Sequence, residues 1–248
     1  FRNIYKSFSF ITFSYSGFIT NQKDIVECAK RFYVDFRTIV NNIPKEKNKY
    51  SQKWLMFDYD GRPDYSTAIK MARDNGFQVA FSSMCIEYWF LLHFESHNGD
   101  AIPLKGNSHS QAIIDKINEH IKKYNKKQDV KNVPYYDKDS KEVTESFFEL
   151  MLSIDTDVTH KRRIENAFNS ALKMHQMKKD NGQEFAESVT PVYQLLIELG
   201  LFTKKETFQN FDVKRDKQDK PYYTNNDGKV NYIENINEII TEYVYNAS

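Results

Sequence analysis

The chain has 248 residues, long enough for one large domain or two small ones. Its formal net charge of +1 excludes a bulk electrostatic attraction to nucleic acid, so any such binding would come from local patches. No apolar run reaches the length of a membrane span, and Cys28 and Cys85 lack zinc-binding spacing. We therefore expect a cytoplasmic protein with reduced thiols and no membrane partner.

The first segment of the chain has the pattern of helix, strand and helix. Residues 1–8 show the spacing of one helix face, and residues 9–15 alternate with many aromatic and β-branched side chains, which predicts a strand. A helix is predicted over residues 21–40, followed by a loop over residues 41–50. Because the chain opens at Phe1 in a helical pattern, we expect the natural protein to begin earlier, with a strand that precedes this residue.

The next segment repeats the alternation of strands and helices. The unbroken apolar run at residues 54–57 is typical of a strand buried on both faces, as in parallel sheets. A helix is predicted over residues 63–75, ended by Gly76 in a left-handed C-cap. Residues 77–81 predict a third strand, and residues 84–94 a further helix. This order predicts a mostly parallel α/β sheet covered by helices.

The pattern changes after Glu95, so we predict an α/β domain at residues 1–95, a helical region at 96–202 and an extension at 203–248. The extension is polar up to a turn at Asn226-Asp227-Gly228, which suggests a hairpin, and a final helix is predicted from Ile233 to Val244. The helical region shows four apolar helix faces. They are Ile113, Ile114, Ile117 and Ile121; Val143, Phe147, Phe148, Leu150 and Met151; Ile164, Ala167, Phe168, Ala171 and Leu172; and Val192, Leu195, Leu196 and Leu199.

Two carboxylates, Asp58 and Asp60, directly follow the second predicted strand. Open α/β sheets place their chemistry just past the carboxyl ends of such strands. Two carboxylates at that edge can share a hard cation such as Mg²⁺. The alternatives are that they cap the next helix or that the doublet is accidental.

Two polar residues stand out in the apolar helix predicted at residues 84–94, which Ser82 or Ser83 would cap. Glu87 lies near its start, and acids are rarely buried without a partner. It is a candidate third acidic group near the metal or a residue that orients a ligand, or it simply favours the helix dipole. His93 is a weaker candidate near the site, or a packing histidine.

Basic runs and tyrosine pairs could contact nucleic acid. These runs are either solvated faces or guides for a phosphate backbone: Lys122-Lys123 with Lys126-Lys127, Lys161-Arg162-Arg163, and Lys178-Lys179. Tyr135-Tyr136 and Tyr222-Tyr223 either stack on bases or pack inside the protein.

The string WLMFDYDGRPDYSTAIKMARDNGFQVAFSSMCIEYWFLLHF, residues 54–94, resembles the central signature of the RloB-like family. That family shows a Trp-led apolar strand ending in Asp-x-Asp, a helix, and then vAxSNPCFExWLLLHF. Downstream, ESVTPVYQLLIEL at residues 187–199 resembles the family's closing NPsTxVxxLvexL. The resemblance covers about residues 1–202.

The sequence departs from the family pattern in three places. Gly61-Arg62 stands where the family tends to have Asp-His, and Ser83-Met84 replaces Asn-Pro. The family also opens with a strand ending CEGxxTExxYF, whose glutamate would face the aspartate pair. Phe1 would fit as the last residue of that motif, so we expect this glutamate to precede Phe1 in the natural protein.

The resemblance implies a Toprim-like fold in which a strand-end glutamate and the Asp-x-Asp pair bind one or two Mg²⁺ ions and promote phosphodiester hydrolysis. Asp58 and Asp60 would then be the metal ligands, with Glu87 and His93 as further catalytic candidates. It also implies a toxin-like nuclease effector of anti-phage abortive infection, which works with an ABC/AAA-type ATPase encoded nearby. RNA such as tRNA, or DNA, would be the substrate.

Two other classes of function stay open on the sequence. The chain could be a non-catalytic subunit that binds and regulates its ATPase partner. It could also be a phosphotransfer or nucleotide-binding enzyme that uses the same acidic edge of the sheet.

Overall fold

The computed structural model describes residues 54–58, 65–98, 109–127, 130–185 and 188–246. The strand predicted at residues 9–15 and the helix at 21–40 lie outside the described residues, as does Cys28. The chain divides into two compact units. Among the described residues, the first unit contains those from 54 to 193 and the second those from 194 to 246, so the border falls inside a helix.

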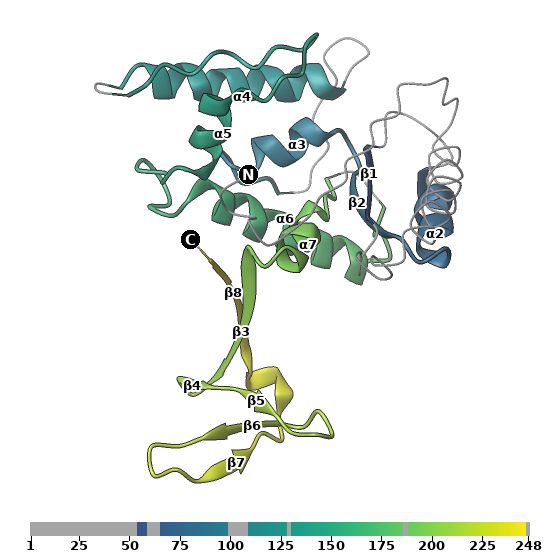
Figure 1. The fold of residues 1–248 in the computed structure, drawn as a ribbon, viewed down its shortest axis with the longest axis vertical. Coiled ribbons are helices and arrows are strands. Elements are labelled where there is room, and N and C mark those ends of the chain that lie inside the picture. The colour runs from purple at the N-terminus through teal and green to yellow at the C-terminus, as the bar shows by residue number, and fades with distance from the viewer. Residues whose placement is uncertain (1–53, 59–64, 99–108, 128–129, 186–187, 247–248) are drawn as a thin grey trace, which may run out of the picture. The chain divides into compact units, whose positions relative to one another are not determined.

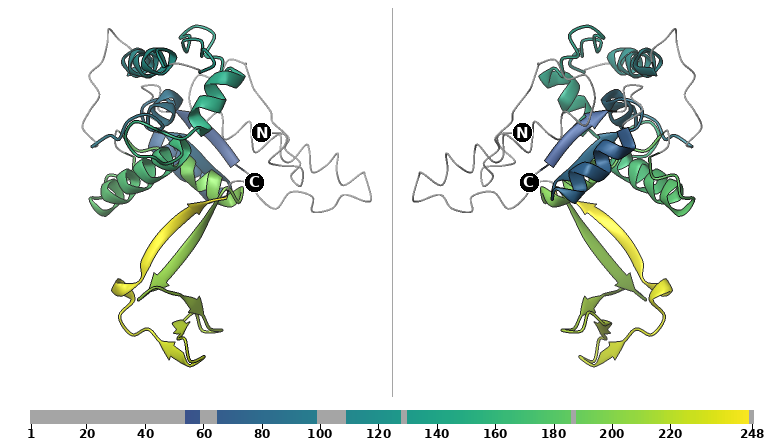
Figure 2. Two further views of the ribbon diagram at one scale, coloured as in Figure 1. Left: turned by 90° about the vertical axis from the view of Figure 1, so that its left-hand side faces the viewer. Right: turned by 90° about the vertical axis from the view of Figure 1, so that its right-hand side faces the viewer.

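A two-stranded parallel sheet with one helix against it forms the first described part of the first unit. Strands β1 (Trp54–Asp58) and β2 (Gln78–Ser82) pair in parallel, and helix α2 (Tyr65–Asp74) lies beside them (Figures 1 and 2). The two predicted strands and the helix between them are confirmed. The register sets Leu55 opposite Val79, so these side chains share one face of the sheet.

That face packs on α2 and forms a continuous apolar core with Phe81 from β2. Burial of each large apolar side chain here contributes about 1.5–3 kcal/mol. On the opposite face Met56 is 53% exposed. The prediction that β1 is buried on both faces is therefore wrong at this position, because α2 covers the face of Leu55 and leaves that of Met56 accessible. The α2 contribution to the core comes from Tyr65, Ala68, Ile69 and Ala72.

Gly76 ends α2 as predicted, with a left-handed φ of 75°. Its N–H donates to the Arg73 carbonyl at 2.9 Å, and the Phe77 N–H donates to the Ala72 carbonyl at 3.0 Å. This pair of bonds is a Schellman motif, which satisfies the last helical carbonyls and turns the chain directly into β2.

Helices make up most of the described residues that follow β2 in the first unit, as the apolar periodicity predicts. Helix α3 contacts both α4 and α6, so the helical region packs on the segment that follows the parallel strands. The predicted faces are buried except at a few edge positions, such as Val143, which is 40% exposed. The helices are α3 (Ile86–Leu91), α4 (His109–Asn125), α5 (Glu145–Leu152), α6 (Arg163–Asp180) and α7 (Val192–Glu198), which continues into the second unit.

Two asparagines on α4 hold the extended segment that follows it. Asn125 pairs with both backbone groups of Val133, accepting from its N–H at 2.9 Å and donating to its carbonyl at 2.8 Å. Asn118 does the same with Tyr136, at 2.8 and 3.0 Å. The two asparagine side chains therefore pair with this segment as a neighbouring β-strand would. They supply hydrogen-bond partners to its backbone N–H and C=O groups without a sheet.

The second unit is built from two three-stranded antiparallel sheets. One has the order β4-β3-β8 and the other β5-β6-β7 (labelled in Figure 1). The strands are β3 (Phe202–Phe208), β4 (Phe211–Asp212), β5 (Lys214–Arg215), β6 (Pro221–Thr224), β7 (Val230–Tyr232) and β8 (Ile240–Tyr245).

The predicted turn at Asn226-Asp227-Gly228 is confirmed, since it joins β6 to β7 and Gly228 has a φ of 80°. The predicted helix from Ile233 to Val244 is wrong. The segment contains a single 3₁₀ turn, Ile236–Glu238, and then β8. The cause is pairing with β3, which runs from Phe202 opposite Tyr245 to Thr207 opposite Ile240. β-branched and aromatic residues in β8 suit a strand once such a partner is present.

Candidate functional site

The two parallel strands end at the same level. Asp58 is the last residue of β1 and pairs with Ser82, the last residue of β2. The chain segments after both strands therefore start from one edge of the sheet, as the metal-site hypothesis requires. Asp60 lies outside the described residues, and of Asp58 the structure describes the backbone.

Glu87 lies in the first turn of α3, which begins shortly after β2 ends. Its side chain is 0% exposed, and neither carboxylate oxygen makes a hydrogen bond within the described part of the chain. The Lys141 ammonium forms an ion pair with its Oε1 at 3.3 Å. Burying a carboxylate without hydrogen bonds costs free energy, so a role for Glu87 other than stabilising the fold has to be considered. The dipole of the short helix α3 offers only weak compensation.

The open oxygens of Glu87 suit a hard cation. Carboxylate oxygens are the ligands that Mg²⁺ prefers, and a buried acid on the helix that follows a parallel strand has the chemistry such a site needs. The residues present therefore fit the ion that the family resemblance implies. Within the described residues, which do not include Asp60, no group of three or more His, Cys, Asp and Glu side chains converges to hold a metal.

Ser83 joins two segments that the sequence singles out, residues 82–94 and residues 188–199. Its hydroxyl donates to the Val189 carbonyl at 2.9 Å and accepts from the Val189 N–H at 2.8 Å. The prediction that Ser82 or Ser83 caps the following helix is wrong, since the N-cap is Cys85, which makes no side-chain cap bond. The reason is that the Ser83 hydroxyl is occupied by Val189, while the Ser82 hydroxyl donates to the Cys85 carbonyl.

We expect Ser83→Ala to lower the free energy of unfolding by about 1–3 kcal/mol, because it leaves the buried Val189 N–H without a partner. Denaturant unfolding monitored by circular dichroism measures this. The matched control is Ser170→Ala on α6, expected to change stability by about 0.5 kcal/mol or less. Equal effects of the two substitutions would show that the Ser83 link contributes nothing.

His93 lies in the turn after α3, because the helix ends at Leu91 and not at Phe94 as predicted. The imidazole is 3% exposed, and its Nδ1 donates to the Trp89 carbonyl at 3.0 Å. Burial lowers the pKa of His93 to about 4, which keeps the ring neutral at pH 7. These contacts favour the packing alternative for this histidine.

This burial predicts acid sensitivity. The folded state holds the pKa of His93 near 4, whereas an exposed histidine titrates near 6.5. Between these values the unfolded chain binds more protons, so stability falls as the pH falls from 6.5 to 4. The loss from this residue is roughly 3 kcal/mol.

Urea unfolding at pH 7 and pH 4.5 measures the effect. His93→Asn, which keeps a donor for the Trp89 carbonyl, should show a smaller stability difference between the two pH values than the unsubstituted protein. An unchanged difference would contradict a buried neutral His93.

Two residues of the basic run Lys161-Arg162-Arg163 make contacts within the fold, which the sequence did not reveal. Arg163 is 7% exposed, with its Nη2 3.6 Å from Asp155 and its guanidinium 5.8 Å from the Phe94 ring centroid. The Arg162 guanidinium donates to the Leu152 carbonyl at 3.3 Å. Two of the three charges are therefore used inside the fold. By contrast, Lys122 and Lys123 are exposed on α4.

The tyrosine pairs are used mainly for packing. Tyr136 is 4% exposed and its ring lies 5.6 Å from that of Phe147. Tyr223 stacks on Phe211 at 5.1 Å. Tyr135, which is 58% exposed, is the member of its pair whose ring is accessible.

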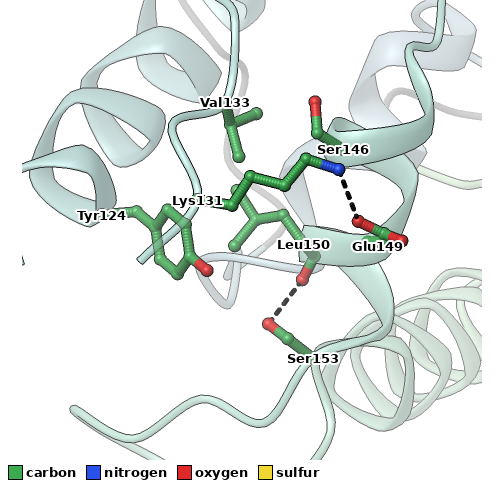
Figure 3. A pocket seen from close by; sticks show the side chains of 7 residues that line it. All are labelled: Tyr124, Lys131, Val133, Ser146, Glu149, Leu150 and Ser153. Carbon is green, nitrogen blue, oxygen red and sulfur yellow. Dashed lines mark hydrogen bonds and ion pairs between the residues drawn. The ribbon is translucent and has the colours of Figure 1, made fainter. Parts of the chain in front are cut away.

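A small cavity of about 160 Å³ lies between the end of α4, the extended segment after it and α5 (Figure 3). Lys131 and Glu149, which both line the cavity, form an ion pair at 3.6 Å. None of the predicted site residues lines it. The cavity is smaller than the ~300 Å³ at which small-molecule pockets begin, so it does not define a competing site.

The described elements define a mixed α/β protein, with a small parallel sheet, packed helices and antiparallel sheets. A family model described as RloB-like protein matches residues 3–199, and the chain belongs to this family. The resemblance seen in the sequence is thereby confirmed. Residues 200–248, which include β3 to β8, lie outside the matched range. Comparisons with curated proteins and with solved structures find no match. Among the helices that the structure describes, none is both long and apolar enough to cross a membrane.

Proposed function

We propose that this protein is a Mg²⁺-dependent nuclease effector of an anti-phage system and works with an ABC/AAA-type ATPase. In this proposal the α/β part has a Toprim-like fold. The family membership and the acidic residues near the ends of the parallel strands support it.

The observation that carries the proposal is the buried Glu87 carboxylate, whose two oxygens make no hydrogen bond to any described residue. A carboxylate kept only for stability would be expected to have hydrogen-bond donors around it. The position of its helix directly after β2, the strand paired with the one that ends at Asp58, supports a metal site at this edge of the sheet.

Each residue has a role in this proposal. Asp58 and Asp60 are the metal ligands, and Glu87 is a further ligand or orients one of them. His93 acts indirectly, by packing on Trp89 and holding the end of α3 in place. When bound, Mg²⁺ would activate a water molecule and neutralise charge on the phosphate. The carboxylates repel one another without a cation, which would make the site depend on the metal.

The test is to incubate the full-length natural protein, with its ATPase partner present, with Mg²⁺ and either total cellular RNA or DNA. We expect discrete cleavage products that EDTA abolishes, with structured RNA such as tRNA as the preferred substrate. Intact RNA and DNA under these conditions would contradict the proposal. If the ATPase still copurified with the protein in that case, the non-catalytic regulatory role would be favoured.

A further inference from the structure

Lys141 reaches Glu87 from a distant part of the chain. Its ammonium lies 3.3 Å from Glu87 Oε1, and the two side chains differ sharply in exposure, 52% for Lys141 and 0% for Glu87. The contact is an ion pair without a hydrogen bond, since neither carboxylate oxygen has a hydrogen-bond partner among the described residues. The singly charged Lys141 ammonium therefore contacts one oxygen of the buried Glu87 carboxylate and leaves most of the lone pairs of that carboxylate without a hydrogen bond from the described residues.

The turn that carries Lys141 is held by its own contacts. The Asp137 carboxylate accepts from the N–H groups of Asp139 at 3.0 Å and Ser140 at 2.7 Å. The Lys141 N–H donates to the Asp137 carbonyl at 3.0 Å, and Lys141 adopts a left-handed φ of 51°. Non-glycine residues adopt this conformation only where their surroundings impose it. These contacts fix the backbone conformation from which the Lys141 side chain reaches Glu87.

Tyr136, the residue before Asp137, attaches this turn to the core. The Tyr136 backbone pairs with Asn118 of α4, and its ring lies 5.8 Å from that of Phe90 in α3, the helix that carries Glu87. The lysine side chain is half-exposed, so its ammonium can move into water at little desolvation cost. The Glu87 carboxylate has no such freedom, because its side chain is fully buried.

We propose that Lys141 is an exchangeable counter-cation of Glu87, which a divalent cation displaces when it binds. The proposal rests on the metal site proposed above. Lys141 keeps the Glu87 charge compensated when no divalent cation is bound, since an uncompensated buried carboxylate would destabilise the fold. Metal binding at Glu87 then releases the Lys141 side chain to solvent. By linkage, a change in Lys141 that weakens its contact with Glu87 strengthens metal binding.

The first test compares Mg²⁺ binding by thermal unfolding of the full chain and of variants. Lys141→Met should have a lower melting temperature than the unsubstituted protein without Mg²⁺ and should recover it as Mg²⁺ is added. Its apparent Mg²⁺ affinity should be about tenfold higher, because the competing cation is gone. Lys138→Met, in the same turn, is the matched control and should behave like the unsubstituted protein. Glu87→Gln combined with Lys141→Met should lose the enhanced response to Mg²⁺.

A second measurement needs no substitution and applies even if Lys141→Met fails to fold. Limited acetylation followed by mass spectrometry should show Lys141 reacting faster in the presence of Mg²⁺, with Lys138 unchanged. Equal reactivity of Lys141 with and without Mg²⁺ would overturn the inference.

The outcomes separate this inference from the proposed function. Equal Mg²⁺ affinity of Lys141→Met and the unsubstituted protein, with weaker binding by Asp58→Asn, would overturn the role of Lys141 and leave the metal site standing. Absence of any Mg²⁺ effect on all of these proteins would overturn both.

Discussion

Asp58→Asn is expected to reduce Mg²⁺-dependent cleavage by about 10³-fold or more, the scale seen when a group central to catalysis is removed. The same substitution should abolish toxicity in cells that carry the proposed ATPase partner. Asparagine is nearly the same size as aspartate, and the pairing of Asp58 with Ser82 is a backbone pairing. The strand should therefore persist while the charge of the proposed metal ligand is lost, and Asp60→Asn should have a similar effect.

The control for these two variants is Asp74→Asn, the same chemical change at an exposed position at the end of α2. It should leave cleavage and toxicity unchanged. Circular dichroism and melting temperature would establish that all three variants are folded. Full activity in a folded protein that carries both Asp58→Asn and Asp60→Asn would rule out the proposed site.

Phe81→Ala is expected to lower the free energy of unfolding by about 3–5 kcal/mol, the usual cost of removing a large buried aromatic side chain. Phe81 is 0% exposed, and its ring lies 5.7 Å from Tyr65, 5.9 Å from Phe185 and 6.5 Å from His175. It thus connects β2 to α2, α6 and the segment after α6. A loss of this size is a large share of the ~5–15 kcal/mol that stabilises a typical domain.

Denaturant unfolding measures this loss, with Tyr135→Ala as the control, since Tyr135 is 58% exposed and removal of its ring should cost about 0.5 kcal/mol or less. Phe81→Leu should fall between the two, because it keeps most of the apolar volume. If Phe81→Ala were as stable as the control, the packing of β2 against its neighbours would be contradicted.

The described helices and strands of the first unit follow closely from the sequence, because the spacing of their apolar residues matches the faces that are buried. Ile113, Ile117 and Ile121 recur at helical spacing and are all 0% exposed on α4. The run from Trp54 forms β1, and Gly76 adopts the left-handed conformation that the end of α2 requires. In each case a local pattern contains the information.

The second unit shows where local pattern fails. The spacing from Ile233 to Val244 predicts a helix, yet Ile240–Tyr245 forms β8 because β3 is available as a partner. The two strands are far apart in the sequence, and neither pattern reveals the other. Tertiary pairing outweighs a weak helical preference in such cases.

For the candidate site, we could predict from the residues alone the family, the position of Asp58 at the end of a strand, and Glu87 as an unusual acid in an apolar helix. Which side chains contact one another became visible only in the folded protein. There, Ser83 bonds to Val189 in place of a helix cap, His93 is buried against Trp89, and Lys141 contacts Glu87. Apolar periodicity records which face of an element is buried, whereas hydrogen bonds and ion pairs between distant residues depend on how the elements pack, and no local spacing encodes that.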